Sequence, residues 1–234
     1  MDYVAIIILA LVGVFVLSGV YKGFTWSIAA LGAMVLSCVL GFACRGIIAK
    51  AFINNYVFYE AMLSYTEGSE YVYDVELVKK NIIEISNDQL DEIMEKSKLP
   101  FPMKDRVYDN IMHEAFKGEG VETLGDYFNE SIVRVTINIM SFLIAYFLFR
   151  VLLTFVLCWV DYSIVFPKLR KADALLGATV SVLRGMISAL ILCTIIPAVL
   201  TVLPFDSIKN MLDSSKLAKI FYTSNLILKL IPGK

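Results

Sequence analysis

The feature that most constrains this chain is a set of four long apolar runs, at residues 3–21, 25–48, 132–160 and 174–203. A helix needs roughly 20 mostly apolar residues to cross about 30 Å of hydrocarbon, and each run is about this long or longer. Hydrophobic residues make up 58% of the chain, whereas soluble domains contain about 45–50%. The sequence therefore predicts an all-α, multi-pass membrane protein with four transmembrane helices in two hairpins.

Charged residues divide the chain into a basic membrane part and an acidic polar part. Residues 52–131 contain 17 Asp or Glu and 7 Lys or Arg, a net charge of −10, while the rest of the chain carries +9. Apolar residues recur at helical intervals in DVELVKKNIIEI and MKDRVYDNIMHEAF, which predicts a small helical domain. In SNDQLDEIMEK the first three residues are suitable N-caps, and KLPFP would end that helix.

The expected domain order follows from these patterns. It comprises a first transmembrane hairpin (1–51), an acidic helical domain (52–131), a second transmembrane hairpin (132–203) and a C-terminal amphipathic segment (204–234). In the last segment six apolar residues recur at helical spacing, namely Ile208, Met211, Leu212, Leu217, Ile220 and Phe221. This pattern fits either a helix lying in the membrane interface or a helix packed against the membrane domain.

Orientation is predicted from the short connections between the apolar runs. The connection between the third and fourth runs carries Lys168, Arg170 and Lys171. The positive-inside rule places such a basic connection in the cytoplasm. Both termini and residues 52–131 are then expected outside the cytoplasm, in a protein of the lipid bilayer.

Two apolar runs carry a small residue at every fourth position. These are Gly177, Ser181, Gly185, Ala189 and Cys193 in the fourth run, and Ala29, Ala33, Ser37 and Gly41 in the second. Small residues let membrane helices approach closely, because lipid leaves packing and polar contacts as the main forces between helices. The two rows are predicted packing surfaces, either within one chain or between the subunits of a homo-oligomer.

Two arginines lie deep within apolar runs, Arg150 in the third and Arg184 in the fourth. A cation near the bilayer centre costs about 3 to well over 10 kcal/mol, and no acid occurs at the same depth. The side chains could extend toward the cytoplasmic end, where Asp161 and Asp173 lie. Alternatively, both could face a hydrated crevice or pore that favours anions.

Two segments carry short glycine motifs. In DYVAIIILALVGVFVLSGVYKGFTWSIAALG, Lys22-Gly23 joins the first two runs, and in ADALLGATVSVLRGMISALIL, Leu176-Gly177 is followed by Arg184-Gly185. In their order and spacing these segments resemble the colicin V production protein family. The chain departs from compact members of that family by its large insert between the second and third runs.

This resemblance implies a protein of the bacterial cytoplasmic (inner) membrane. It also implies an association with peptide-toxin production or export and with envelope homeostasis, and a family without an established enzymatic activity. The family-like positions are Lys22, Gly23, Gly177, Arg184 and Gly185.

The sequence holds no recognisable catalytic or cofactor-binding arrangement. The single histidine, His113, lies in the acidic part, and the four cysteines lie in apolar runs without metal-ligand spacing. Gly-rich phosphate loops, nucleophile motifs and basic nucleic-acid-binding patches do not occur. We therefore expect a protein that is not an enzyme, uses no cofactor or metal and does not bind nucleic acid.

Two function classes are consistent with these patterns. The first is a scaffold or accessory factor whose residues 52–131 engage envelope or secretion proteins. The alternative is a small oligomeric channel or transporter with a pore near Arg150 and Arg184. A continuous hydrated path past Arg184 would distinguish the second class from the first.

Overall fold

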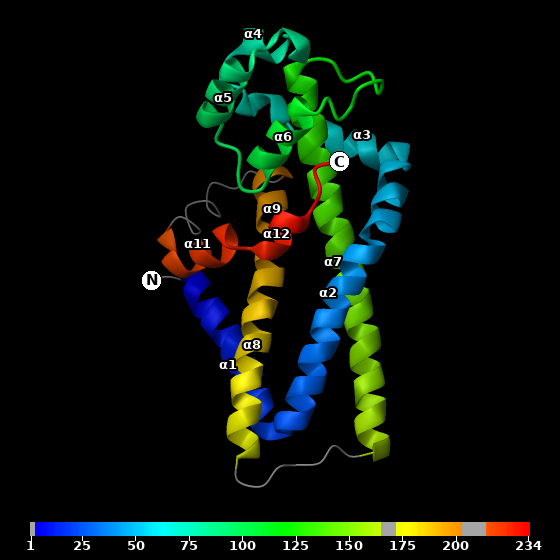
Figure 1. Ribbon diagram of the computed structural model, residues 1–234, viewed down its shortest axis with the longest axis vertical. Coiled ribbons are helices and arrows are strands. Elements are labelled where there is room, and N and C mark those ends of the chain that lie inside the picture. Colours follow the sequence, from blue (N-terminus) through cyan, green and yellow to red (C-terminus); the bar gives the residue numbers. More distant parts are fainter. Residues whose placement is uncertain (1–2, 165–171, 203–213) are drawn as a thin grey trace. The chain divides into compact units, whose positions relative to one another are not determined.

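The computed structural model describes residues 3–164, 172–202 and 214–234 (Figure 1). Within these ranges the chain is helical and forms no strand; Asn81 and Thr123 make an isolated antiparallel bridge. This confirms the all-α class. The helices are α1 (Tyr3–Lys22), α2 (Phe24–Ile53), α3 (Tyr56–Tyr65), α4 (Val75–Val78), α5 (Asn87–Lys96), α6 (Met103–Met112), α7 (Leu124–Ile164), α8 (Asp173–Cys193), α9 (Ile196–Val202), α11 (Lys216–Thr223) and α12 (Leu226–Leu230), with 3-10 turns at Gly68–Tyr71 and Ile82–Glu84.

Four helical segments of the described chain are long and apolar enough to cross a membrane: Val4–Lys22, Phe24–Ile53, Leu124–Tyr162 and Asp173–Thr201. They match the four predicted runs, although α7 already begins at Leu124, within the acidic part. The fourth run is also interrupted, because α8 ends at Cys193 and α9 begins at Ile196. Pro197 explains the interruption, since its ring would clash with the carbonyl four residues earlier in a continuous helix.

The chain forms two compact units, each assembled from separate pieces of sequence. Unit 1 comprises Met1–Gly46, Ser141–Thr194 and Ser207–Asn225, and unit 2 comprises Ile47–Met140, Ile195–Asp206 and Leu226–Lys234. Each unit is described separately below.

Unit 1 contains the close pair α1 and α8, and α2 packed against α7. The rings of Phe42 on α2 and Phe142 on α7 lie 4.5 Å apart between centroids. Many large apolar side chains of this unit are exposed, among them Ile7, Leu9, Val14, Leu17, Val151, Phe155, Trp159 and Leu175. Such a surface is unfavourable in water and suits the hydrocarbon of a bilayer.

The amphipathic helix α11 packs against α1 and α8 in unit 1. Its buried face includes Ala218 and Tyr222, whereas Ile220 is 62% exposed. After the helix, the Asn225 side chain donates a hydrogen bond of 2.8 Å to the backbone carbonyl of Leu190 on α8. Of the two arrangements expected for this segment, the described part therefore shows the packed one. Residues 204–213 lie outside the described residues.

Unit 2 has its own apolar core, built mainly from α5, α6 and the first half of α7. Core side chains with at most 2% exposure include Leu90, Ile93, Met103, Val107, Phe116, Leu124, Phe128, Ile132 and Leu228. Ser86 is the N-cap of α5, because its hydroxyl accepts from the N–H of Gln89 at 3.3 Å. The start and end predicted for this helix are confirmed, and residues 52–131 all belong to unit 2.

Candidate functional site

The turn between α1 and α2 is held by a carboxylate from α8. Gly23 has a φ of +85°, which favours glycine, and a Cβ at this position would collide with the Asp173 side chain. Asp173 Oδ1 accepts a hydrogen bond of 3.0 Å from the N–H of Phe24, the first residue of α2. Because Asp173 is also the first residue of α8, one buried carboxylate lies at the positively polarised ends of two helices.

Replacing Asp173 tests this anchor. We expect Asp173→Ala to lower the free energy of unfolding in mild detergent by about 1–3 kcal/mol, because it leaves the partly buried N–H group of Phe24 without its acceptor. Asp173→Asn is the matched control, since it retains an acceptor oxygen and loses only the charge. The asparagine variant should lose less than half as much free energy of unfolding as the alanine variant. Equal stability of the alanine variant and the natural protein would contradict the anchoring role.

The small-residue row of α8 faces α1 of the same chain. Gly177, Ser181, Gly185, Ala189 and Cys193 are all buried. A Cβ on Gly177 would collide with the carbonyl oxygen of Gly19, and a Cβ on Gly185 would lie 2.9 Å from the Cα of Val12. The two backbones thus approach closely along more than two helical turns, and α1 occupies this face of α8.

The second small-residue row, on α2, has a different neighbour. A Cβ on Gly41 would lie 3.3 Å from both the Phe142 ring and the backbone nitrogen of Tyr146, so this position faces α7. Ser37 is fully buried and donates a hydrogen bond of 2.7 Å to the carbonyl of Ala33 on its own helix. Ala29 is half-buried. At the positions where contacts are described, the two rows therefore pack against separate helices.

Arg184 is connected to the Lys22-Gly23 turn by a chain of hydroxyl groups. Its Nη1 donates to Ser181 Oγ at 3.4 Å, Ser181 Oγ donates to Ser27 Oγ at 3.2 Å, and Ser27 Oγ donates to the Gly23 carbonyl at 2.8 Å. Arg184 is only 5% exposed, and both serines are fully buried. Its side chain extends one turn toward the N-terminus of α8, the usual direction in helices. The two family-like motifs are thus linked through buried polar contacts.

Arg150 lies in the same unit, on α7. It is half-buried, and its Nη1 is buried without a hydrogen-bond partner among the described residues. Arg150 and Arg184 belong to the same unit, on α7 and α8 respectively.

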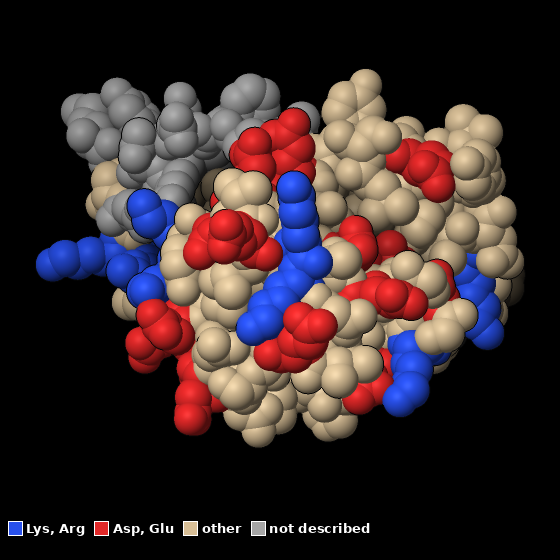
Figure 2. Space-filling view, turned by 90° about the horizontal axis from the view of Figure 1, so that it is seen from above, with Lys and Arg blue, Asp and Glu red and all other residues tan. Residues whose placement is uncertain are grey.

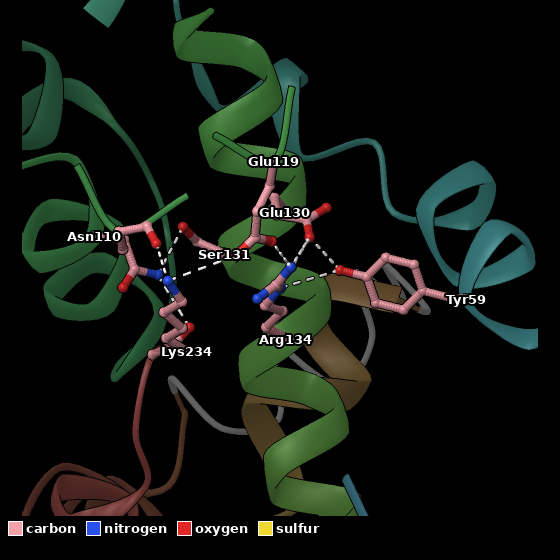
Figure 3. Close-up of polar contacts among 9 residues, drawn as sticks. Tyr59, Asn110, Glu119, Glu130, Ser131, Arg134 and Lys234 are labelled. Carbon is pink, nitrogen blue, oxygen red and sulfur yellow. Dashed lines mark hydrogen bonds and ion pairs between the residues drawn. The ribbon is translucent and has the colours of Figure 1, made fainter. Parts of the chain in front are cut away.

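Unit 2 contains a cluster of ionic side chains at α7, which Figure 3 shows in detail. Glu130 Oε1 accepts from Arg134 Nε at 2.8 Å and also from the Tyr59 hydroxyl. Arg134 also pairs with Glu119 and lies 3.2 Å from the Tyr59 oxygen. Side-chain exposure is 12% for Arg134 and 10% for Glu130. Burial and the hydrogen bond to Glu130 raise the pKa of Tyr59, so its phenol stays neutral as a donor.

The last described residues of the chain are bound to the same part of unit 2. The Asn110 amide nitrogen donates to Ser131 Oγ at 2.9 Å and to the Gly233 carbonyl at 3.0 Å (Figure 3). Asn138 donates to the Pro232 carbonyl at 3.3 Å. Side chains of α6 and α7 therefore fix this segment by its backbone.

An open groove of about 490 Å³ lies between α5 and α6. Its lining contains four carboxylates and one ammonium group around two larger side chains: Asp91, Glu95, Asp105, Asp109, Lys104, Met94 and Tyr108. A hydrogen bond to Asp91 raises the pKa of Tyr108. Figure 2 shows carboxylates spread over the face seen from above, with basic side chains between them. The groove is thus an acidic recess with an aromatic and a thioether side chain.

The remaining candidates for chemistry lie apart from these sites. His113 is exposed, with Nδ1 2.8 Å from the Asp109 carbonyl oxygen. Within residues 3–164, 172–202 and 214–234, no group of three or more His, Cys, Asp or Glu side chains could hold a metal ion. Sequence reasoning missed Asp173 as an anchor and the Glu130–Arg134 pair. The four-residue spacing of that pair was a usable signal.

The fold and these sites define a multi-pass α-helical membrane protein with a second, polar helical unit. Residues 119–225 match the family described as Colicin V production protein. This match confirms the resemblance over these residues and, with the four apolar helices, indicates a bacterial membrane protein. The match includes Gly177, Arg184 and Gly185, whereas Lys22 and Gly23 lie before it. No curated protein and no solved structure matches the chain.

Proposed function

We propose that the protein is a scaffold or accessory factor of the bacterial cytoplasmic membrane. In this role residues 52–131 hold partner proteins of the envelope or secretion machinery, in support of toxin production or export and of envelope homeostasis. The match of residues 119–225 to the colicin V production protein family supports this setting. The observation that carries the proposal is the acidic groove between α5 and α6 on a unit with its own core.

The groove suits a partner segment that is both basic and amphipathic. Its four carboxylates and one ammonium would attract Lys or Arg side chains, and complementary charge increases the rate and selectivity of association. Met94 and Tyr108 add polarisable and aromatic surface, which is common at protein interfaces. A recess of this composition therefore favours binding of another protein.

The proposed orientation places residues 52–131 and both termini outside the cytoplasm. The basic connection at Lys168, Arg170 and Lys171, which lies outside the described residues, supports this orientation. The structure adds that Gly23 packs against Asp173, the first residue of α8. Lys22, next to that turn, therefore adds a basic residue to the same end of unit 1.

Reversing the charge of the groove tests the scaffold function. We expect the double variant Asp91→Lys/Asp105→Lys to lower activity about tenfold or more, because like charges would face a basic partner. Activity is measured as toxin export or as survival under envelope stress in a strain that lacks the protein.

The control has the same change in charge at exposed acids outside the groove, Glu76→Lys/Glu84→Lys. It should retain at least half of the activity, and both variants should reach the natural membrane level. Full activity of the groove variant at that level would rule out the groove as the partner site.

A further inference from the structure

The short helix α3 of unit 2 follows the end of α2 after two residues and is packed on one side only (Figure 1). Its packed side carries four large side chains: Phe58, Tyr59, Met62 and Leu63. They cover a small core formed by Ala49 on α2 with Val133 and Ile137 on α7. The opposite side of the helix is exposed, with Val57 at 77% and Tyr65 at 74%.

The exposed side of α3 consists of two rows that run along the helix. Val57, Ala61 and Tyr65 form an apolar row, because residues four apart are neighbours on a helix surface. A polar row runs beside it with the same spacing: Tyr56, Glu60 and Ser64. Glu60 is the only charged residue of the helix. The surface of α3 therefore changes from apolar to polar across its exposed side.

Contacts on the packed side give the direction of each row. With 3.6 residues per turn, Phe58 comes next to the apolar row around the helix, and Tyr59 comes next to the polar row. The Phe58 ring lies 4.9 Å from the ring of Phe52 in the last turn of α2, a helix that can span the membrane. The Tyr59 hydroxyl donates to Glu130, ahead of the third apolar run. The apolar row thus lies on the side of the apolar spans, and the polar row lies on the side of the ionic cluster.

The small core beneath α3 gives its level along the two spans. Ala49 lies near the end of α2, and Val133 lies one residue after the start of the third apolar run (132–160). Both contacts are therefore at the ends of apolar stretches, where hydrocarbon gives way to lipid headgroups. Tyrosine is enriched at this level because it combines an apolar ring with a polar hydroxyl group. Tyr56 and Tyr65 are the first and last residues of α3, and both are exposed.

We propose that α3 lies in the membrane interface, with its apolar row (Val57, Ala61 and Tyr65) in contact with lipid acyl chains. An interfacial helix needs one face for the acyl boundary and another for water and headgroups, and the two rows provide these faces. This contact holds unit 2 at the bilayer surface. It is separate from the four spans and does not depend on the acidic groove or on the scaffold function.

Photocrosslinking of the full chain tests this contact in liposomes of phosphatidylethanolamine and phosphatidylglycerol. Val57→p-benzoylphenylalanine and Tyr65→p-benzoylphenylalanine each place a benzophenone on the apolar row, where light couples it to nearby C–H bonds. We expect lipid adducts, measured by mass spectrometry, at least about fivefold above those of Ile83→p-benzoylphenylalanine. Ile83 is the matched control, because it is apolar, 79% exposed and in the same unit, but outside α3 and the four candidate spans.

A second control uses the polar row of the same helix. Glu60→p-benzoylphenylalanine should give at most about half of the lipid adduct obtained at Val57, because the polar row faces headgroups and water. Equal adduct yields at Val57, Tyr65 and Ile83 would overturn the proposal.

The identity of the crosslinked molecule tests the choice of lipid as the occupant of this face. Crosslinks from Val57 and Tyr65 mainly to a second copy of the chain would overturn the proposal. Crosslinks mainly to another protein in native membranes would do the same. If the Val57 variant does not reach the membrane, Ala61→p-benzoylphenylalanine replaces it on the same row, with the same expected yield.

Discussion

Gly177→Leu is expected to separate α1 from α8 and to lower the free energy of unfolding of unit 1 by at least about 3 kcal/mol. A Cβ at Gly177 collides with the Gly19 carbonyl, and the next nearest atoms are backbone atoms of Gly23. Backbone cannot rotate away as a flexible side chain can, so the helices must move apart. Unfolding in mild detergent, followed by circular dichroism over a denaturant series, measures the effect.

Gly13→Leu provides the matched control on α1. A Cβ at Gly13 has no atom within 4 Å, so the larger side chain meets open space or lipid. Gly in a helix interior is about 0.5–1 kcal/mol less favourable than Ala, and the control should therefore be neutral or slightly stabilising. Equal losses in the two variants would show that the α1–α8 contact contributes nothing specific to stability.

This contact illustrates what the sequence could predict about the membrane unit. The row from Gly177 to Cys193 is visible as a spacing of four residues, and all its members are buried. Spacing describes one helix surface and does not name its neighbour. The choice of α1 follows from Gly19 and Gly23, which are four residues apart but form a single pair and not a row, and Gly23 lies after the end of the first apolar run. The Lys22-Gly23 turn and the row of small residues on α8, which are separate motifs in the sequence, therefore form one contact in the structure.

Helix boundaries show the same division between local and long-range information. Ser86 was among the caps expected for α5, because capping depends on residues within one turn. The end of α8 at Cys193 was missed, although Pro197 is a local signal, because the apolar run continues through it. Asp173 could not be identified as an anchor, since its acceptor role depends on Phe24, 149 residues away.

The ion-pair cluster of unit 2 was missed for a different reason. Glu130 and Arg134 are four residues apart on one helix, which is a recognised spacing for ion pairs. The expected boundary at residue 131 divided them between the acidic part and an apolar run. In the structure α7 continues from Leu124 to Ile164, so both lie on one helix. Tyr59 and Glu119 then complete the cluster from distant segments.

Arg134→Met is expected to lower the free energy of unfolding of unit 2 by about 3–5 kcal/mol. The change removes the only described cation bonded to Glu130, whose side chain is 10% exposed. The carboxylate then keeps the Tyr59 hydroxyl as a donor but loses its ion pair. Lys96→Met is the control, because it breaks a pair with Glu92 in which both side chains are at least half exposed. Its expected cost is below about 1 kcal/mol.

A double-mutant cycle separates the ion pair from packing in this cluster. Glu130→Gln alone leaves the Arg134 guanidinium with Glu119, so its loss should be smaller than that of Arg134→Met. In Arg134→Met/Glu130→Gln no uncompensated buried charge remains at residue 130. The double variant should therefore regain at least about 1 kcal/mol relative to Arg134→Met, since replacing both members of a buried pair costs less than removing one. Strict additivity of the two single changes would show that Glu130 and Arg134 do not stabilise unit 2 as a pair.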